Sequence, residues 1–307
     1  MIALSVKTAL LQLIVRSLAL LPLPLLRGMG RAAGWLLYRL PNRERETARV
    51  NLRLCFPQLK EEERAALLRR SLRETATTLL EMPAIWHRRS DYWLARLDPG
   101  PVREEILALH RQGRGVIVAM PHMGNFELSA PFFGHLGLPA TGLYRPPRQA
   151  GLEAVMVAGR CRSGAVRMVP TTRQGIRELH RALARGEMVG ILPDQQPKKG
   201  RGGTGVFAPF MGVPAWTMTL LGRLARKSGA PVYFLAFLRR PGSSRYQVVG
   251  RRGDAAIGGE DLERSAAALN AGVEAMVRLA PEQYQWTYRR FEQQPDGSNP
   301  YRPTEGS

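Results

Sequence analysis

Two residues of this sequence are suited by type and spacing to acid–base chemistry: His122, and Glu127 five positions later. Histidine is the side chain whose proton affinity suits a general base near neutral pH. A carboxylate on its second ring nitrogen would fix the tautomer and stabilise the charged imidazolium, and a turn across five residues can bring Glu127 back to His122. We therefore predict that both residues are catalytic, with His122 as the base and Glu127 holding its ring.

The surroundings of His122 favour an active-site loop. The apolar run Val116–Ala119 comes shortly before it and is typical of a buried strand. Ligands of open α/β sheets bind at the carboxyl ends of strands, and a helix that begins there offers free backbone N–H groups. Gly124 leaves room for a substrate, so Gly124 and Asn125 are substrate-binding candidates. The spacing pattern alone is weak, and a loop histidine bonded to a backbone carbonyl is the alternative.

Further candidates for substrate binding are arginines and polar residues in other segments of the chain. Planar guanidinium groups suit the oxygens of phosphates and carboxylates. The chain contains 40 arginines, so a solvated surface charge stays open as the alternative for each of them. The substrate-binding candidates of this group are Arg145, Arg160, Arg162, Asp194 and Gln195.

Several catalytic classes lack their motifs in this sequence. It contains no G-x-S-x-G nucleophile elbow, no H-E-x-x-H metalloprotease pair and no G-x-x-x-x-G-K-[ST] phosphate loop. The two cysteines, Cys55 and Cys161, form neither a metal-binding spacing nor a disulfide framework. The sequence therefore predicts neither a metal site nor a cofactor, and it favours a reducing compartment.

Short apolar runs alternate with amphipathic stretches after residue 115, which is the pattern of an α/β sandwich. The runs predict buried strands at 116–119, 189–192, 232–237 and 246–249. Helical periodicity predicts helices over 61–81 and around 176–183, 217–227 and 262–276. The polar tail 293–307 is expected to be a mobile end.

The first 40 residues are predicted to attach the protein to a membrane. The stretch Thr8–Leu26 is largely apolar and long enough to cross a hydrocarbon core of about 30 Å. Arg16 would cost roughly 2.5–3.5 kcal/mol in the centre of a span, and Pro22 and Pro24 interrupt the helix. A transmembrane span and an interfacial helix both remain open, and a cleaved signal peptide or an ordinary buried helix is the competing interpretation.

The chain is strongly basic, with 45 Lys and Arg against 25 Asp and Glu and a formal net charge of +20. Its partners are therefore expected to be anionic: nucleic acid, acidic lipids, a phosphorylated substrate or an acidic protein. Ten basic and two acidic residues lie within the first 60 positions. Because most of them follow the apolar stretch, the positive-inside rule favours the cytoplasmic side for the bulk of the protein.

Seven features occur along the chain in an order that is typical of one family. They are the apolar N-terminus, Val50–Pro57, His122–Glu127 in the form H-x-G-N-aromatic-E, Tyr144–Pro146, Arg160–Gly164, Asp194-Gln195 followed by Val206–Gly212, and Pro281–Arg290. Over nearly its whole length the sequence resembles the lipid A biosynthesis late acyltransferases of Gram-negative bacteria, within the lysophospholipid acyltransferase superfamily. Phe126 stands where many members have tryptophan, and 208–212 departs from a more usual Phe-Phe-Gly.

This resemblance implies a glycerol-phosphate-acyltransferase-like αβα sandwich with a mixed central sheet and an N-terminal membrane-anchoring helix. It divides the chain into an anchor with an interfacial helix (1–40), an acyltransferase domain (41–292) and the tail (293–307). The implied reaction moves a fatty acyl chain directly from an acyl carrier protein thioester to a hydroxyl of a lipid A precursor, on the cytoplasmic face of the inner membrane. Arg145 or Arg160 would meet the oxyanion or a substrate phosphate.

The implied partners are acyl carrier protein, the lipid A precursor and anionic membrane lipids, and no nucleic acid is expected. Two alternatives stay open. The same chemistry could serve another lipid, such as a mannosylated phosphatidylinositol or an ornithine lipid. The alternative from another class is a basic nucleic-acid- or membrane-binding protein, although the sequence shows no recognition helix or aromatic RNA-binding motif.

Overall fold

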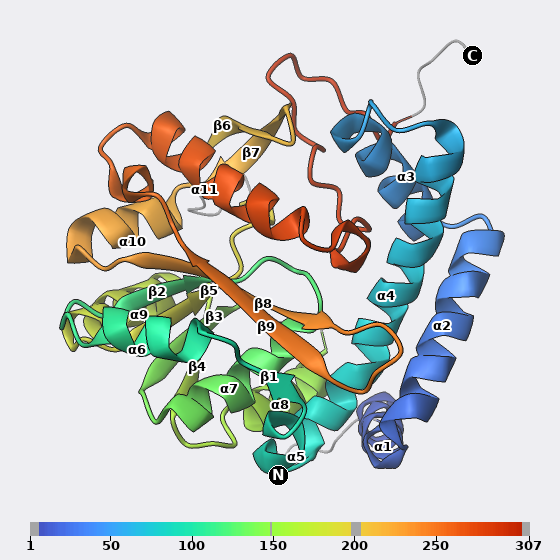
Figure 1. The fold of residues 1–307 in the computed structure, drawn as a ribbon, viewed down its shortest axis with the longest axis horizontal. Coiled ribbons are helices and arrows are strands. Elements are labelled where there is room, and N and C mark those ends of the chain that lie inside the picture. The colour runs from blue at the N-terminus through green and yellow to red at the C-terminus, as the bar shows by residue number, and fades with distance from the viewer. Residues whose placement is uncertain (1–5, 148, 198–203, 303–307) are drawn as a thin grey trace.

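A seven-stranded sheet forms the centre of the molecule, and helices pack on both of its faces (Figure 1). The computed structural model describes residues 6–147, 149–197 and 204–302. The strand order is β1-β9-β8-β2-β5-β3-β4, and all neighbours are parallel except β8 and β9. The strands are β1 (Leu97–Asp98), β2 (Val116–Ala119), β3 (Ala140–Tyr144), β4 (Val166–Pro170), β5 (Met188–Ile191), β8 (Val232–Arg239) and β9 (Tyr246–Arg252). The predicted mixed α/β fold is confirmed.

Continuous apolar sequence marks the central strands. β2, β5 and β8 are buried along their full length, as expected for strands covered on both faces. Because β2, β5, β3 and β8 are parallel, their carboxyl ends meet at one edge of the sheet. The loops that follow β2 and β5 are therefore neighbours, although 72 residues separate His122 from Asp194.

Alternating side chains of the strands build an apolar core on each face of the sheet. Ile117 and Ala119 of β2 pack in one core, with α3, α4, α9, α10 and α11. Val116 and Val118 pack in the other, with α5, α6, α7 and the last turns of α4, as the period of two requires. The helices are α3 (Arg43–Cys55), α4 (Glu61–His87), α5 (Ser90–Leu94), α6 (Val102–His110), α7 (Ser129–Leu136), α8 (Ala150–Arg160), α9 (Arg173–Ala184), α10 (Leu220–Ser228) and α11 (Leu262–Val277).

A separate antiparallel hairpin, β6 (Gly205–Phe210) and β7 (Val213–Met218), packs against α11. Its two-residue turn at Met211 and Gly212 has φ values of 51° and 79°. Positive φ at both central residues is the geometry that suits the right-handed twist of a tight hairpin. This hairpin occupies the segment whose sequence departs from the family pattern.

The N-terminus forms two helices, α1 (Val6–Leu20) and α2 (Leu23–Arg39), which meet at an angle of 120°. The break lies at Pro22, where the prolines of the sequence predict an interruption. Among the described residues, no single helix has the length and apolar character to cross a membrane, whereas the bent pair meets both criteria when taken together. Both helices expose large apolar side chains: Leu10, Leu13, Ile14, Leu20, Leu25, Met29, Trp35 and Leu36.

The polar C-terminal segment packs back on the domain as far as it is described. The Tyr301 hydroxyl contacts the side chain of Asn51 and accepts a hydrogen bond of 3.0 Å from the Phe291 backbone N–H. Arg289 lies over the Tyr301 ring, 5.5 Å from its centroid. The sequence did not predict these contacts, and residues 303–307 of the predicted mobile tail lie outside the described residues.

Candidate active site

His122 lies in the loop after β2 and is held by Asp194, which lies in the loop after β5. The His122 Nδ1 atom is 2.7 Å from Asp194 Oδ1, and the His122 backbone N–H donates to Asp194 Oδ2 at 2.9 Å. The His122 side chain is 17% exposed and that of Asp194 only 2%. Asp194 thus uses both carboxylate oxygens to fix one residue.

The electrostatics of this pair select the tautomer of the imidazole. Burial acts to raise the pKa of Asp194, but the charge and hydrogen bonds of His122 outweigh it and leave that pKa below its ordinary value. An ionised Asp194 selects the neutral tautomer that carries its proton on Nδ1, and in that tautomer the lone pair lies on Nε2. The Gln195 amide nitrogen lies 3.3 Å from this Nε2. His122 is therefore positioned to accept a proton through Nε2.

An aromatic ring fixes the other side of the imidazole. The Phe126 ring meets the His122 ring edge to face, with centroids 5.1 Å apart and an interplanar angle of 70°, a favourable arrangement for such rings. Phe126 belongs to a short 3₁₀ turn, Phe126–Leu128, which begins after Asn125. The aromatic position of the motif therefore contacts the predicted base directly.

The predicted hydrogen bond between Glu127 and His122 is wrong. Glu127 is fully buried, and its carboxylate is occupied by Arg160 and Trp86: Arg160 Nε and Trp86 Nε1 each donate to Oε2 at 2.8 Å, and Arg160 Nη2 donates to Oε1 at 2.5 Å. Burial acts to raise the pKa of Glu127, but Arg160 outweighs it and lowers that pKa. Asp194, a substrate-binding candidate in the sequence, takes the place expected for Glu127.

Gly124 and Asn125 serve the packing of the loop, which corrects the expectation that Gly124 leaves room for a substrate. Gly124 has a φ of 56°, and a Cβ there would lie 2.0 Å from the Phe237 carbonyl oxygen. Asn125 is fully buried. Its side chain donates to Glu81 at 2.8 Å and accepts from the Glu127 backbone N–H at 3.3 Å. Neither residue presents a side chain to a substrate.

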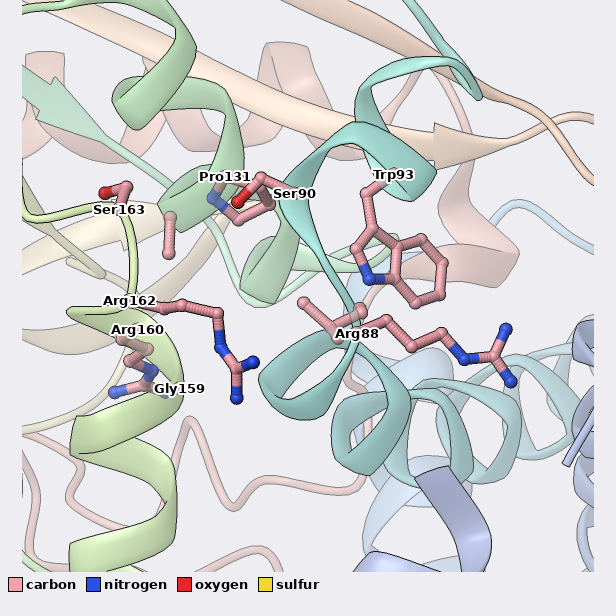
Figure 2. A pocket seen from close by; sticks show the side chains of 10 residues that line it. Arg88, Ser90, Trp93, Pro131, Gly159, Arg160, Arg162 and Ser163 are labelled. Atoms are coloured by element: carbon pink, nitrogen blue, oxygen red, sulfur yellow. The ribbon is translucent and has the colours of Figure 1, made fainter. Parts of the chain in front are cut away.

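The three candidate arginines lie in different environments. Arg160 is engaged by Glu127, as described above. Arg162 is exposed and donates to the Trp86 carbonyl at 2.8 Å, and Figure 2 shows these two side chains leaving the end of α8 in different directions. Arg145 is exposed after β3. Burial raises the pKa of Tyr288, whose hydroxyl accepts from the Gln196 backbone N–H, and the charge of Arg145 acts against this rise. Arg145 thus stands at the edge of the sheet that also bears His122 and Asp194.

A mainly apolar cavity of about 50 Å³ opens beside Glu127 and Arg160. It lies between α7 and the strands β2, β3, β4 and β5, near the end of the sheet that bears His122. Gly142 and Gly190 of two adjacent strands form part of its wall. Its other lining residues are Met120, Phe126, Ser129, Ala130, Phe133, Ala140, Leu143, Val166, Met168 and Leu192.

Sequence reasoning did not identify the α4 residues Glu81 and Trp86. Trp86 donates to Glu127, and Glu81 accepts from Asn125, so both support the loop from behind. A signal for Glu81 was present, because a single carboxylate in the otherwise apolar helical stretch 79–86 indicates a buried charge. Its partners, which lie far away in sequence, gave no comparable signal.

Acid should destabilise the fold through these buried carboxylates. The pKa values of Asp194, Glu127 and Glu81 are lower in the fold than their ordinary values. Each group therefore stabilises the protein above its ordinary pKa, about 4, and this stability is lost as the pH falls through the folded-state value. We expect the Tm to hold between pH 7 and about 5.5 and to fall below that range.

Circular-dichroism melting across pH 3.5–7 measures this effect. Glu127→Gln is expected to lower the Tm at pH 7 and to reduce its fall at acid pH, because the variant has lost one of the responsible groups. Glu260→Gln, a substitution of an exposed carboxylate, is the control. An acid fall of the same size in Glu127→Gln and Glu260→Gln would contradict the assignment.

Fold and site together define an α/β enzyme with a histidine–carboxylate pair at the carboxyl edge of its sheet, and Phe126 connects this pair to an apolar cavity. Residues 4–293 match the family described as bacterial lipid A biosynthesis acyltransferase. The chain therefore belongs to that family of acyltransferases, and the resemblance seen in the sequence is confirmed.

Individual relatives agree with this family. The chain is 31% identical over 280 residues to a lipid A biosynthesis lauroyltransferase of Escherichia coli K12, and this match covers 90% of the chain and 88% of the relative. It is 31% identical over 287 residues to a lipid A biosynthesis palmitoleoyltransferase of the same strain, and this match covers 91% of the chain and 89% of the relative. It is 32% identical over 295 residues to a lipid A biosynthesis acyltransferase of Haemophilus influenzae, and this match covers 93% of the chain and 90% of the relative.

Proposed function

We propose that the protein transfers a fatty acyl chain from an acyl carrier protein thioester to a hydroxyl of a lipid A precursor. The observation that supports this most directly is the His122–Asp194 pair, in which Asp194 faces Nδ1 and leaves Nε2 to take a proton. Phe126 packs against the imidazole and also lines the apolar cavity. The relatives are named for lipid A biosynthesis and for lauroyl and palmitoleoyl transfer. A base next to an apolar cavity is the combination that acyl transfer to an alcohol requires.

In the proposed mechanism, His122 Nε2 takes the proton of the acceptor hydroxyl as its oxygen attacks the thioester carbonyl carbon. Asp194 stabilises the imidazolium that forms. The tetrahedral intermediate then collapses, the carbon–sulfur bond breaks, and the imidazolium returns the proton to the leaving thiolate. The new ester and the free thiol balance the reaction, and no enzyme nucleophile is needed.

Two of the three candidate arginines, Arg160 and Arg145, have different roles in this proposal. Arg160 lines the apolar cavity and donates two hydrogen bonds to the Glu127 carboxylate, so its guanidinium would lie near the carbonyl end of a chain bound there. It would stabilise the oxyanion, a contribution of about 3–4 kcal/mol for a single donor. Glu127 then acts by positioning Arg160. Arg145, which is exposed, suits a substrate phosphate.

The apolar cavity would receive the acyl chain, and a substitution at Gly190 would reduce the space left for that chain. A Cβ at Gly190 would lie 3.3 Å from the flexible Met120 Cε, so Gly190→Ala fills space at little cost to folding. One methyl group in such a pocket changes discrimination by about 10-fold or more. We expect the ratio of long-chain to short-chain transfer to fall by that factor, measured by competition between thioesters of two lengths. An unchanged ratio would place the chain elsewhere.

The location proposed is the inner membrane, with the catalytic domain on the cytoplasmic face. The apolar side chains exposed by α1 and α2 support an attachment at the lipid surface. The net charge of +20 would favour anionic lipids, the phosphates of the acceptor and an acidic carrier protein.

The test incubates detergent-purified protein with lipid A precursors and a panel of acyl carrier protein thioesters, followed by mass spectrometry. The expected product is heavier by one acyl group, with release of free carrier thiol. Acylation of an ornithine lipid or a mannosylated phosphatidylinositol, and not of a lipid A precursor, would contradict the proposed acceptor. Acyl transfer from another thioester, but not from the carrier protein, would contradict the proposed donor.

A further inference from the structure

A buried ionic cluster lies behind the loop that bears His122. Its centre is Glu81 of α4, which is fully buried. Glu81 Oε1 accepts from Arg27 Nε at 2.7 Å, and Oε2 accepts from Arg239 Nη2 at 2.7 Å and Nε at 3.0 Å. Burial acts to raise the pKa of Glu81, but the two arginines outweigh it and lower that pKa.

This cluster is bonded directly to the loop. Asn125 Nδ2 donates to Glu81 Oε2 at 2.8 Å, and Asn125 Oδ1 accepts from the Glu127 backbone N–H at 3.3 Å. A second connection runs through Thr78, which receives a bond of 2.7 Å from Arg239 and donates to the Gly124 carbonyl at 2.8 Å. The backbone from Gly124 to Glu127 is therefore held at both ends by groups bonded to the Glu81 cluster.

The cluster also connects the N-terminal helix pair to the site. Arg27 belongs to α2, which lies along α4 (Figure 1), and its guanidinium lies 5.0 Å from the Tyr246 ring centroid. Burying charges is costly, and well-packed apolar residues in their place are often as stable or more so. Fold stability alone is therefore a weak explanation for an ion cluster at this position.

We propose that Glu81 is a positioning residue for the acyl transfer: it fixes Asn125, and through it the turn that places Phe126 against His122 and Glu127 against Arg160. This inference rests on the proposed function. Glu81 is too deeply buried to contact substrate, so it acts only through the loop. A displacement of about 1 Å at reacting groups can reduce turnover about 100-fold.

The test compares Glu81→Gln with Glu74→Gln. Glu74 also pairs with Arg239, through Nη1 at 3.1 Å, but it is 29% exposed, and Arg239 lies at the end of β8 rather than in the loop. It is therefore a matched control. We expect Glu81→Gln to lower kcat by ~10-fold or more with little change in KM, and Glu74→Gln to keep kcat within about twofold. Folded Glu81→Gln with wild-type kcat would overturn the proposal.

Two further measurements cover the case in which Glu81→Gln does not fold or wild type shows no transfer. Asn125→Leu breaks the bond between the loop and Glu81 and keeps both arginine pairs of Glu81, so it should also lose kcat; unchanged kcat would overturn the proposal. Hydrogen–deuterium exchange of the peptide 120–128 reads loop order without any substrate. Faster exchange in Asn125→Leu or Glu81→Gln, but not in Glu74→Gln, is expected, and equal exchange in all three would overturn the proposal.

If the wild-type protein transfers no acyl chain but the exchange results are as expected, the proposed function is contradicted and the positioning of the loop by Glu81 is not.

Discussion

Replacing His122 with alanine is expected to lower kcat for acyl transfer by ~10²–10⁴-fold, the usual contribution of a positioned general base. The acceptor hydroxyl must lose its proton as it attacks, and His122 Nε2 is the group placed to take it. Binding of the acyl chain and of the acceptor does not use the imidazole, so KM for both substrates should change little. The loss should therefore appear almost entirely in kcat.

The measurement is a steady-state assay of acyl transfer, with circular dichroism to verify folding. His135→Ala is the matched control, because it makes the same replacement at an exposed histidine of α7. It should retain wild-type turnover. A folded His122→Ala protein that keeps more than about a tenth of wild-type activity would exclude His122 as the base.

The central strands β2, β5 and β8 and the helices α4, α9, α10 and α11 followed from local patterns in the sequence, whereas α3, α5, α6 and α8 were not predicted. The runs that form β2, β5 and β8 are apolar and continuous because helices cover both sides of them. β3 and β4 were missed, since their sequences, ATGLY and VRMVP, mix small, polar and charged residues. Both strands lie toward one end of the sheet, and their carboxyl-terminal residues are less buried than their first residues. Their sequences are therefore less uniformly apolar than those of the central strands.

The partner of His122 could not be predicted from spacing. A carboxylate five residues away is the nearest candidate in sequence, but Glu127 turns toward Arg160 and Trp86. Asp194 reaches His122 only because β5 lies beside β2 in the sheet. Strand order depends on crossover connections over the whole domain, and a single sequence does not encode it in any local pattern. The position of both residues after predicted strands was nevertheless visible.

Replacing Asp194 with asparagine is expected to lower kcat by ~10²–10⁴-fold while leaving the fold intact. Asp194 Oδ2 accepts from the His122 backbone N–H, and Oδ1 faces Nδ1. In the variant the amide oxygen can keep the backbone bond, so the NH₂ group must face Nδ1. That arrangement favours the tautomer with its proton on Nε2, and the atom that should accept the hydroxyl proton is then already protonated.

A pH profile separates this role from a structural one. Asp194→Asn removes the anion that stabilises the imidazolium, so the acidic limb of the kcat/KM profile should move to lower pH. Glu127→Gln is the contrasting variant, because Glu127 bonds to Arg160 and not to the imidazole. This variant should lower kcat/KM at every pH and leave the acidic limb of the profile at its wild-type position. A limb that moves in Glu127→Gln and stays fixed in Asp194→Asn would reverse the two assignments. Such a result would mean that the working enzyme pairs His122 with Glu127, as the spacing of five residues first predicted.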